Sequence, residues 1–411
     1  MLTQRFPPHR GAAARRFRHL AERFAGAFTV YVIRAGEPAP RPEAVTRDWP
    51  LTTHDLRHYA VGKDRATVPA KIKKRTPVRQ FLRLRQAFPF VHLLDDGGPG
   101  YRSQALAIAR ELVREGEVTT LFSSYQPWTD HLVARELKKE FPHLRWIADF
   151  RDLPVDPIRR DVWWPALQRR WGRGIIRRAD EVWCVSEGQA AQLRGWHPEV
   201  RVHRNALRHL PPAVSSPVSE RFTVVYTGSL YPRLQSIAPL VRALRDGFAA
   251  GWLAPEKFRL VYRGKDAELW REWTRTLPEE CLDTADYVDT AAAEELQLNA
   301  QILLLLTWSA PGYYGVLTAK LYDYLATGRP VLALVNGPGD RELEGIIRGA
   351  AAGAVVGEKE QGEMGEWLRR RYVEWSEGDS LTWRVNKEFL IDFMDGQQLT
   401  PFDQDGAAHG A

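Results

Sequence analysis

The chain has 411 residues, of which 44% are hydrophobic and 27% charged, as in a folded protein long enough for two domains. It has 58 lysines and arginines against 51 acidic residues, and the formal net charge of +7 suits anionic partners such as nucleotides, membranes or nucleic acid. Its two cysteines belong to no CxxC or Cys/His cluster, which excludes a disulfide framework and a zinc-finger signature.

The N-terminal residues and the longest uncharged run bear on localisation. Residues 1–8 lack the apolar core of a secretory signal. The uncharged run 296–319 has an apolar centre much shorter than the ~20 residues that a membrane-spanning helix requires. We therefore expect a cytoplasmic protein, which could associate peripherally with the inner face of a membrane.

Apolar strands alternate with helical segments in the first half of the chain. The expected strands are 29–33, 118–122, 145–149 and 181–185, and the expected helices are 12–24, 103–114 and 129–140. Between them, the basic and proline-containing segment 37–76 favours a long loop or insertion. The alternation predicts an α/β domain with a doubly wound sheet over residues 1–206.

A second series follows residues 207–220, whose proline and serine content predicts an interdomain linker. Its expected strands are 222–226, 258–262, 299–308, 331–334 and 354–356, and a helix over 317–327 is closed by Gly328 and Pro330. The pattern predicts a second doubly wound domain over 221–375. We expect a C-terminal helix within 376–399 that returns to the first domain, and a disordered tail over 400–411.

Ligands of such sheets bind beyond the carboxyl ends of the strands, so residues that follow strands are candidate site residues. In the first half, strand 145–149 runs into Asp149-Phe-Arg151-Asp152. Two carboxylates and a guanidinium could orient an acceptor hydroxyl or hold a phosphate, which makes Asp149, Arg151 and Asp152 candidate catalytic residues. The alternative is a structural ion pair that fixes the loop.

Two further positions of the first half are candidate ligand-binding residues. Phe6-Pro-Pro-His-Arg-Gly11 predicts a tight loop that enters a helix, whose free N–H groups would suit a pyrophosphate. Asn205 could contact a ligand, although an asparagine in a turn needs no function to explain it.

In the second half, Tyr226-Thr-Gly228-Ser229 ends the first strand with a glycine that lets a ligand approach the backbone closely, and Arg233 follows. Gly264-Lys265 repeats the arrangement after the next strand. Each glycine alone is typical of a turn. Because Arg233, Lys265 and Lys320 all follow strands of one sheet, we expect these basic side chains to converge at one edge.

The segment from Gly315 to Pro330 is the most informative part of the chain, because Lys320 and Asp323 lie three residues apart on one helical face directly after an apolar strand. A carboxylate can accept hydrogen bonds from two ribose hydroxyls, while an ammonium and the N–H groups of a helix start, here at Thr318, can hold a diphosphate. The constellation predicts a sugar-nucleotide site. A solvated Lys–Asp pair is the alternative.

Residues 159–178 combine seven arginines with three tryptophans (Trp163, Trp164 and Trp171) and two isoleucines (Ile175 and Ile176). Basic residues attract anionic lipid and indoles favour the interface, so this segment could dock on an anionic membrane. The alternative is a helix whose tryptophans and isoleucines pack in the core while its arginines are solvated.

Taken in order, these landmarks resemble the family 4 type glycosyltransferases, which have the two-Rossmann-domain glycosyltransferase-B fold. The matching stretches are Phe6 to Gly11, Ser123-Ser124 with Pro127 and His131, Asp149 to Asp152, Ala179 to Ser186, Asn205, Tyr226 to Leu230, and Lys320 to Pro330. The resemblance implies two Rossmann-like domains facing across a cleft, the N-terminal one binding the acceptor and the C-terminal one the donor. It implies transfer of a sugar from a nucleotide sugar to a hydroxyl of a saccharide or lipid-linked acceptor, usually with retention, as in cell-envelope polysaccharide or glycolipid biosynthesis.

Carried over residue by residue, the resemblance places Asp323 on the family's ribose-binding acid, here Asp in place of Glu. The first acid of the same motif falls on Gly315, so its usual contact to the donor sugar is missing. The family's arginine after the strand-end glycine falls on Ser229, which leaves Arg233 or Lys320 to neutralise the diphosphate. The first strand is nearly missing, because only residues 1–4 precede the loop.

The mechanism that we expect needs no metal or other cofactor, since positive side chains would stabilise the diphosphate leaving group as a metal would. Two rival functions remain, a sugar-nucleotide epimerase on the same fold and a catalytically inactive sugar-nucleotide-binding subunit, which the loss of the first acid at Gly315 keeps open. We expect no nucleic-acid partner, because the basic residues are spread over many segments.

Overall fold

The computed structural model of the protein describes residues 1–3, 6, 12–35, 43–44, 56–61, 84, 87–91, 98, 100–158, 162–212, 220–378 and 385–394. Its internal contacts divide the chain into two compact units, Met1–Arg204 and Asn205–Ala411. The expected linker over 207–220 thus begins just inside the second unit, and its residues 213–219 lie outside the described part, as does the tail over 400–411.

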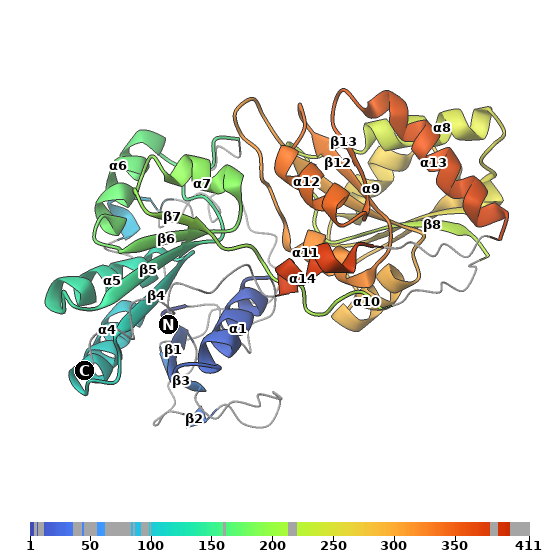
Figure 1. The fold of residues 1–411 in the computed structure, drawn as a ribbon. Coiled ribbons are helices and arrows are strands. Elements are labelled where there is room, and N and C mark those ends of the chain that lie inside the picture. Colours follow the sequence, from blue (N-terminus) through green and yellow to red (C-terminus); the bar gives the residue numbers. More distant parts are fainter. Residues whose placement is uncertain are drawn as a thin grey trace. The chain divides into compact units, whose positions relative to one another are not determined.

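The N-terminal unit is an α/β unit whose sheet is built from two groups of strands (Figure 1). Its elements are α1 (Ala12–Ala25), β1 (Val30–Ala35), β2 (Glu43–Ala44), β3 (Leu56–Val61), α4 (Tyr101–Arg114), β4 (Thr120–Tyr125), α5 (Trp128–Glu140), β5 (Arg145–Phe150), α6 (Pro165–Ile176), β6 (Glu181–Cys184), α7 (Glu187–Leu193) and β7 (Val200–Val202). The strand orders are β1-β3-β2 and β4-β5-β6-β7, and every described pair except β2 with β3 is parallel.

A single residue, Leu2, joins the two groups of strands, because it forms parallel bridges to Ile33 of β1 and Ser123 of β4. Its N–H donates to the Phe122 carbonyl at 2.7 Å, and Leu2 is fully buried. The first strand, expected to be nearly missing, is therefore reduced to one bridging residue. The expectation of a loop over 37–76 was wrong where the structure describes β2 and β3, and its other residues lie outside the described part.

The C-terminal unit has one six-stranded sheet in the order β10-β9-β8-β11-β12-β13, parallel throughout. Its strands are β8 (Phe222–Thr227), β9 (Phe258–Arg263), β10 (Leu282–Ala285), β11 (Ile302–Trp308), β12 (Val331–Asn336) and β13 (Gly353–Val356). Its helices are α8 (Ala238–Ala249), η1 (Pro255–Lys257), α9 (Ala267–Thr274), η2 (Glu279–Cys281), α10 (Thr290–Leu298), α11 (Ala319–Thr327), α12 (Arg341–Gly349), α13 (Gln361–Ser376) and α14 (Lys387–Met394).

Both faces of this sheet are covered by helices (Figure 1), because successive side chains of a strand point to opposite faces. Val224 and Leu304 lie in the core that includes residues of α8, α9 and α13. Their neighbours Val225 and Leu303 lie in the core that includes residues of α11, α12 and α14. The central strands are largely apolar for this reason, and each unit is a doubly wound sheet of the expected kind.

The last described helix, α14, packs on the C-terminal unit and corrects the expectation that it returns to the first domain. Leu390 and Phe393 are buried in the core of the C-terminal unit together with residues of α11 and α12. The Phe393 carbonyl accepts a hydrogen bond from the Leu207 N–H at 3.1 Å. The apolar face of this short helix is thus buried against its own unit.

Candidate functional site

The strand order of the C-terminal unit fixes where a ligand would bind. From β8 the chain runs to β9 and β10 on one side and then to β11, β12 and β13 on the other, so the order reverses between β8 and β11. The described pairing of β8 with β11 covers two residue pairs, and beyond it the Gln235 side chain donates to the Leu306 carbonyl at 2.9 Å. The carboxyl ends of these two strands form the switch point at which open α/β sheets bind ligands.

Lys320 and Gly228 meet at this switch point although they are 92 residues apart in the sequence. The Lys320 Nζ donates to the Tyr226 hydroxyl at 2.8 Å and lies 4.4 Å from the centre of the Tyr226 ring. A Cβ added to Gly228, whose φ is 122°, would lie 2.6 Å from Lys320 Cε. The positive φ favours glycine here, and any larger side chain would displace the end of Lys320.

The tyrosines under Lys320 form a hydrogen-bonded platform. Tyr226 donates to the Ser229 carbonyl at 2.8 Å, and Tyr262 donates to the Gly228 carbonyl at 3.0 Å. The two rings lie nearly parallel, with centroids 6.0 Å apart, and both stack on Trp270. Aromatic packing and these bonds hold the Gly228 loop in one conformation.

Burial lowers the pKa of Lys320 to about 8, and the nearby carboxylates of Asp323 and Asp266 partly oppose that shift. Burial likewise raises the pKa of Tyr262 to about 12 and that of Tyr226 further, so both stay neutral and can hydrogen-bond. A lysine that is desolvated against neutral phenols is stabilised by any anion that binds beside it, because the anion favours its charged form.

The start of α11, the helix that carries Lys320, lacks a side-chain capping hydrogen bond. Thr318 is the N-cap of α11, but its hydroxyl makes no capping bond and is buried without a hydrogen-bond partner among the described residues. The preceding loop is fixed by Asp340, whose carboxylate accepts from the N–H groups of Gly315 at 2.7 Å and Val316 at 3.2 Å. A helix start with free N–H groups and an unpartnered hydroxyl suits a phosphate.

Asp323 lies on the same helix as Lys320 and remains partly exposed. Its carboxylate is 3.7 Å from the Arg208 guanidinium, which pairs more closely with Glu294 at 2.6 Å. A partly exposed ion pair of this length is weak.

The remaining candidate residues of this unit differ in exposure. Ser229 is partly buried, and its carbonyl accepts the hydrogen bond from Tyr226. Arg233 and Lys265 are both exposed. No described contact joins either of them to Lys320, so the convergence of three basic side chains stays a prediction for these two.

Sequence reasoning overlooked Trp308 at the end of β11. Its indole Nε1 is buried, and the described residues offer it no hydrogen-bond partner. The ring centroids of Trp308 and the exposed Tyr231 lie 5.4 Å apart. It also overlooked Tyr226 as the partner of Lys320. The available signal was an aromatic residue at or near the end of a strand, Trp308 in β11 and Tyr226 in β8. This signal is weak, because tryptophan and tyrosine are common in strands.

In the N-terminal unit, the candidate catalytic residue Asp149 forms a buried ion pair. It is fully buried, pairs with the Arg16 guanidinium at 2.6 Å, and accepts from the Ser124 hydroxyl at 3.1 Å. The same guanidinium donates to the Arg204 carbonyl at 3.2 Å. A carboxylate enclosed in this way favours the structural ion pair over a direct contact with substrate as the interpretation of Asp149.

The neighbouring candidates Arg151 and Asp152 are less buried than Asp149. The Arg151 guanidinium lies 3.4 Å from the Asp152 carboxylate, and 44% of the Asp152 side chain is exposed, which leaves Asp152 accessible to an acceptor. Asn205 is partly buried, and Gly11 lies outside the described residues.

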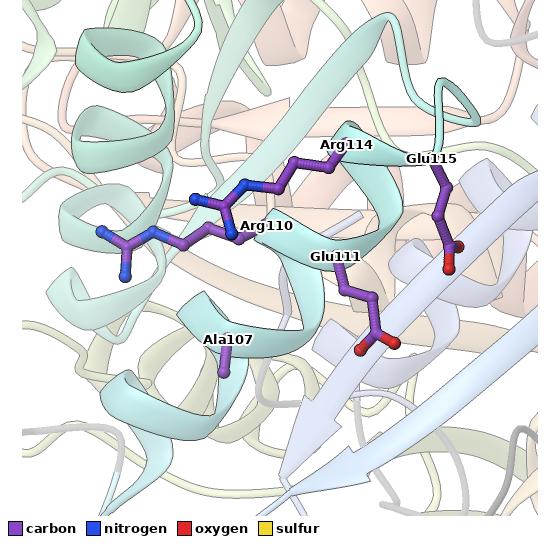
Figure 2. A pocket seen from close by; sticks show the side chains of 5 residues that line it. All are labelled: Ala107, Arg110, Glu111, Arg114 and Glu115. Carbon is purple, nitrogen blue, oxygen red and sulfur yellow. The ribbon is translucent and has the colours of Figure 1, made fainter.

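A hollow on the N-terminal unit carries no comparable chemistry. It is lined by Ala107, Arg110, Glu111, Arg114 and Glu115, all on or at the end of α4 (Figure 2). Both arginines pair with Glu140 of α5, at 2.6 and 2.9 Å. This is a solvated helix surface away from the strand ends.

Among the described residues, no three His, Cys, Asp or Glu side chains gather in a group that could hold a metal ion. Within the same part of the chain, no helix is long and apolar enough to cross a bilayer.

Solved structures resemble this fold, whereas no family model and no curated protein sequence matches the chain. The trehalose-6-phosphate synthase OtsA superposes with a TM-score of 0.53 at 10% identity, covering 96% of this chain and 94% of that one. The N-terminal domain of Candida albicans trehalose-6-phosphate phosphatase gives 0.51 at 10% identity, covering 97% and 96%. TarM gives 0.47 at 9% identity, covering 72% and 54%. The first two superpositions, together with the two parallel-stranded units, show that the chain has two Rossmann-like domains of the glycosyltransferase-B fold.

Proposed function

We propose that this protein is a glycosyltransferase of the family 4 type, which takes a sugar from a nucleotide-sugar donor and transfers it to a hydroxyl of a saccharide or lipid-linked acceptor. The proposal includes retention of configuration, a cytoplasmic location and a role in cell-envelope polysaccharide or glycolipid biosynthesis. The observation that carries it is Lys320, a desolvated lysine at the switch point of the C-terminal sheet, held between Tyr226 and Gly228.

The donor's diphosphate is the group that this arrangement fits best. The Lys320 ammonium supplies the positive charge, and the start of α11 supplies backbone N–H groups and the Thr318 hydroxyl. Gly228 has no side chain to separate a phosphate from the backbone, and its neighbour Gly264 could not carry one, since an added Cβ would lie 2.1 Å from the Gly228 carbonyl oxygen.

The nucleoside would lie beside the diphosphate, with its ribose hydroxyls donating to Asp323. That residue follows Lys320 by one helical turn and keeps an accessible carboxylate. Each hydrogen bond to a charged carboxylate contributes about 1.5–3 kcal/mol.

In the reaction, the bond between the anomeric carbon and the diphosphate oxygen breaks, a bond from the acceptor oxygen to that carbon forms, and the hydroxyl proton is released. Lys320 and the α11 start stabilise the negative charge that develops on the leaving diphosphate, so the proposal requires no metal. Asp152, the exposed member of its pair with Arg151, is the candidate for orienting the acceptor hydroxyl.

One observation favours a second candidate, a sugar-nucleotide-binding subunit without transferase activity. Gly315 has a φ of 77° and its N–H donates to the buried Asp340, so no carboxylate can be supplied from this position to the donor sugar. Such a subunit would bind the nucleotide sugar as tightly as the enzyme does. An epimerase, the other alternative, would convert the donor without an acceptor.

A nucleotide panel followed by a turnover assay tests the proposal. We expect one of UDP, GDP, TDP or ADP to raise the unfolding temperature without magnesium, since a ligand at 100 times its Kd adds about 2.7 kcal/mol of stability. The matching nucleotide sugars are then incubated with acceptor mixtures, and transferase activity requires release of nucleoside diphosphate that depends on the acceptor. Binding without release would support the inactive subunit, and an epimer formed without acceptor would support the epimerase. No stabilisation by any nucleotide would contradict all three.

A further inference from the structure

Helix α6 has one face packed in the N-terminal core and one face turned outward. Gln168, Gly172 and Ile175 are buried on the inward face. A Cβ added to Gly172 would lie 2.3 Å from the Trp196 ring, and the Trp171 ring lies 5.0 Å from that of Trp128. The structure thus assigns Trp171, Ile175 and Ile176 to core packing, which removes them from the membrane-docking set that the sequence suggested.

The outward side begins with an apolar group at the helix start. Trp163 is 40% exposed, Trp164 48% and Leu167 38%, which places all three among the exposed large hydrophobic residues of the described chain. The two indoles contact each other edge to face with centroids 5.8 Å apart. Trp164 has a φ of 48°, an uncommon conformation for a bulky residue.

Arginines continue this outward side along the helix. Arg169, Arg170 and Arg173 are exposed, and Arg169 and Arg173 lie one turn apart on the same face. The sequence from 162 to 179 contains no acidic residue, although Asp161 directly precedes it. The nearest described carboxylate that follows, Asp180, is paired with Lys138 at 2.8 Å. The positive charge of this face is therefore not neutralised from within the helix.

We propose that the α6 surface, formed by Trp163, Trp164, Leu167, Arg169, Arg170 and Arg173, docks the protein on an anionic lipid bilayer. Indoles and a leucine bury their apolar parts at the headgroup boundary, while arginines on the adjoining face pair with lipid phosphates. An aliphatic residue between the indoles and the arginines favours a bilayer over a polynucleotide, whose bases would stack on aromatic rings alone. The inference does not depend on the proposed transferase activity, although a lipid-linked acceptor would lie in the same bilayer.

The size of the effect follows from the charges. Basic residues near an anionic surface each contribute roughly 1 kcal/mol, so replacing two arginines should weaken vesicle binding by at least about tenfold. Replacing both exposed indoles should weaken it to a similar degree or more, because the apolar contribution is then lost.

Vesicle flotation of the full chain, without nucleotide, tests the proposal. The protein is mixed with vesicles of phosphatidylcholine alone or of phosphatidylcholine with one third phosphatidylglycerol. We expect flotation with the anionic vesicles only, weakened by added salt. It should also be weakened in an Arg169→Ser, Arg170→Ser variant and in a Trp163→Ala, Trp164→Ala variant.

The chain offers matched controls for both variants. Arg369 and Arg370 are adjacent exposed arginines on α13, and Tyr287 is 76% exposed. Replacing the first two by serine, or Tyr287 by alanine, should leave flotation unchanged. The proposal is overturned if flotation is absent, if it ignores lipid charge, if the control pair weakens it equally, or if the α6 surface binds a single-stranded RNA oligonucleotide but no vesicle. Circular dichroism of each variant confirms that a loss of binding is not a loss of folding.

Discussion

The two units carry polar groups at the same place in the same kind of sheet, but they use them differently. At the carboxyl ends of β4 and β5, Asp149 is fully enclosed by Arg16 and Ser124. At the carboxyl ends of β8 and β11, Lys320 is held by one phenol, and Thr318 and Trp308 keep buried polar atoms with no partner in the described structure.

This difference separates a structural network from a binding site. A buried charge whose bonds are all made within the protein fixes a loop and has nothing left to offer a ligand. A partly buried ammonium whose one described hydrogen bond goes to a neutral phenol, and a buried hydroxyl with no described partner, gain energy when a ligand completes their bonds. We therefore propose ligand binding in the C-terminal unit and loop fixation by Asp149 in the N-terminal one.

The largest expected effect is on the N-terminal network. Asp149→Asn should destabilise the protein by about 3–5 kcal/mol, because the Arg16 guanidinium would stay buried without a counter-charge. Urea denaturation of the variant and of the parent measures the difference.

The matched control is Asp152→Asn, three residues along the same loop. Its carboxylate is 44% exposed, so the loss should be within about 0.5 kcal/mol. If Asp149→Asn proved as harmless to stability as this control but abolished sugar transfer, Asp149 would be a catalytic residue after all.

Acid should destabilise the N-terminal unit through two buried histidines. Burial lowers the pKa of His131 and of His203 to about 3, below the usual 6.5, so the unfolded chain binds more protons between these values. Stability should fall with decreasing pH in that window by about 1.4 kcal/mol per pH unit for each histidine. Thermal unfolding between pH 7 and pH 4 measures the slope.

His203→Phe sharpens this test, because His203 stacks on Trp183 with ring centroids 3.9 Å apart and phenylalanine can retain that contact. The variant should lose about half of the pH slope. An unchanged slope would show that other groups cause the acid sensitivity.

Lys320→Met should stabilise the free protein by about 1–3 kcal/mol at pH 7. The folded pKa of about 8 lies below the ordinary 10.5, so the unfolded chain binds more protons between those values, and wild-type stability should rise with pH across this window. Methionine fills the same space without a charge. Chemical denaturation at pH 7 and at pH 10 should show the variant's advantage shrink as wild-type Lys320 loses its proton, and a destabilised variant would contradict the assignment of an unsatisfied charge.

The smallest expected effect concerns Asp323. Asp323→Ala should weaken nucleotide binding by about 1–3 kcal/mol if its carboxylate accepts from the ribose hydroxyls. Calorimetric titration with a nucleoside diphosphate and with its 2′-deoxy analogue provides the control, because the variant should no longer distinguish the two. Equal affinities of variant and wild type would remove Asp323 from the site.

Much of the fold could be predicted from the sequence because it depends on local patterns. Apolar runs placed β5, β8 and β11 within a residue or a few of their observed bounds, and Gly328 marked the end of α11 with a φ of 71°. The alternation of strands and helices was enough to predict two doubly wound units.

What could not be predicted depends on contacts between distant segments. Arg16 and Asp149 are 133 residues apart, and no local pattern shows that they pair. The same holds for Leu2, where one residue serves as a strand because β1 and β4 supply both neighbours. The packing of α14 likewise follows from where its apolar face finds a partner, not from its own sequence.

The candidate site was predicted in outline because its landmarks follow strands, and the structure supplied its physical basis. The sheet rule led us to expect Lys320 at the edge that also carries Arg233 and Lys265, whereas its approach to Gly228, 92 residues away, was not predicted. The phenol beneath the lysine and the unused Thr318 cap were visible only in three dimensions.

The most direct test of the central claim is the Kd of the preferred nucleoside diphosphate for three proteins at pH 7, measured by calorimetric titration. These are the wild type, Lys320→Met and Lys257→Met, the last being an exposed lysine at the opposite, amino end of the same sheet. We expect Lys320→Met to bind about tenfold to a hundredfold more weakly, as for a lost charged hydrogen bond, and Lys257→Met to match the wild type. Equal affinity of all three proteins would contradict the placement of the diphosphate beside Lys320.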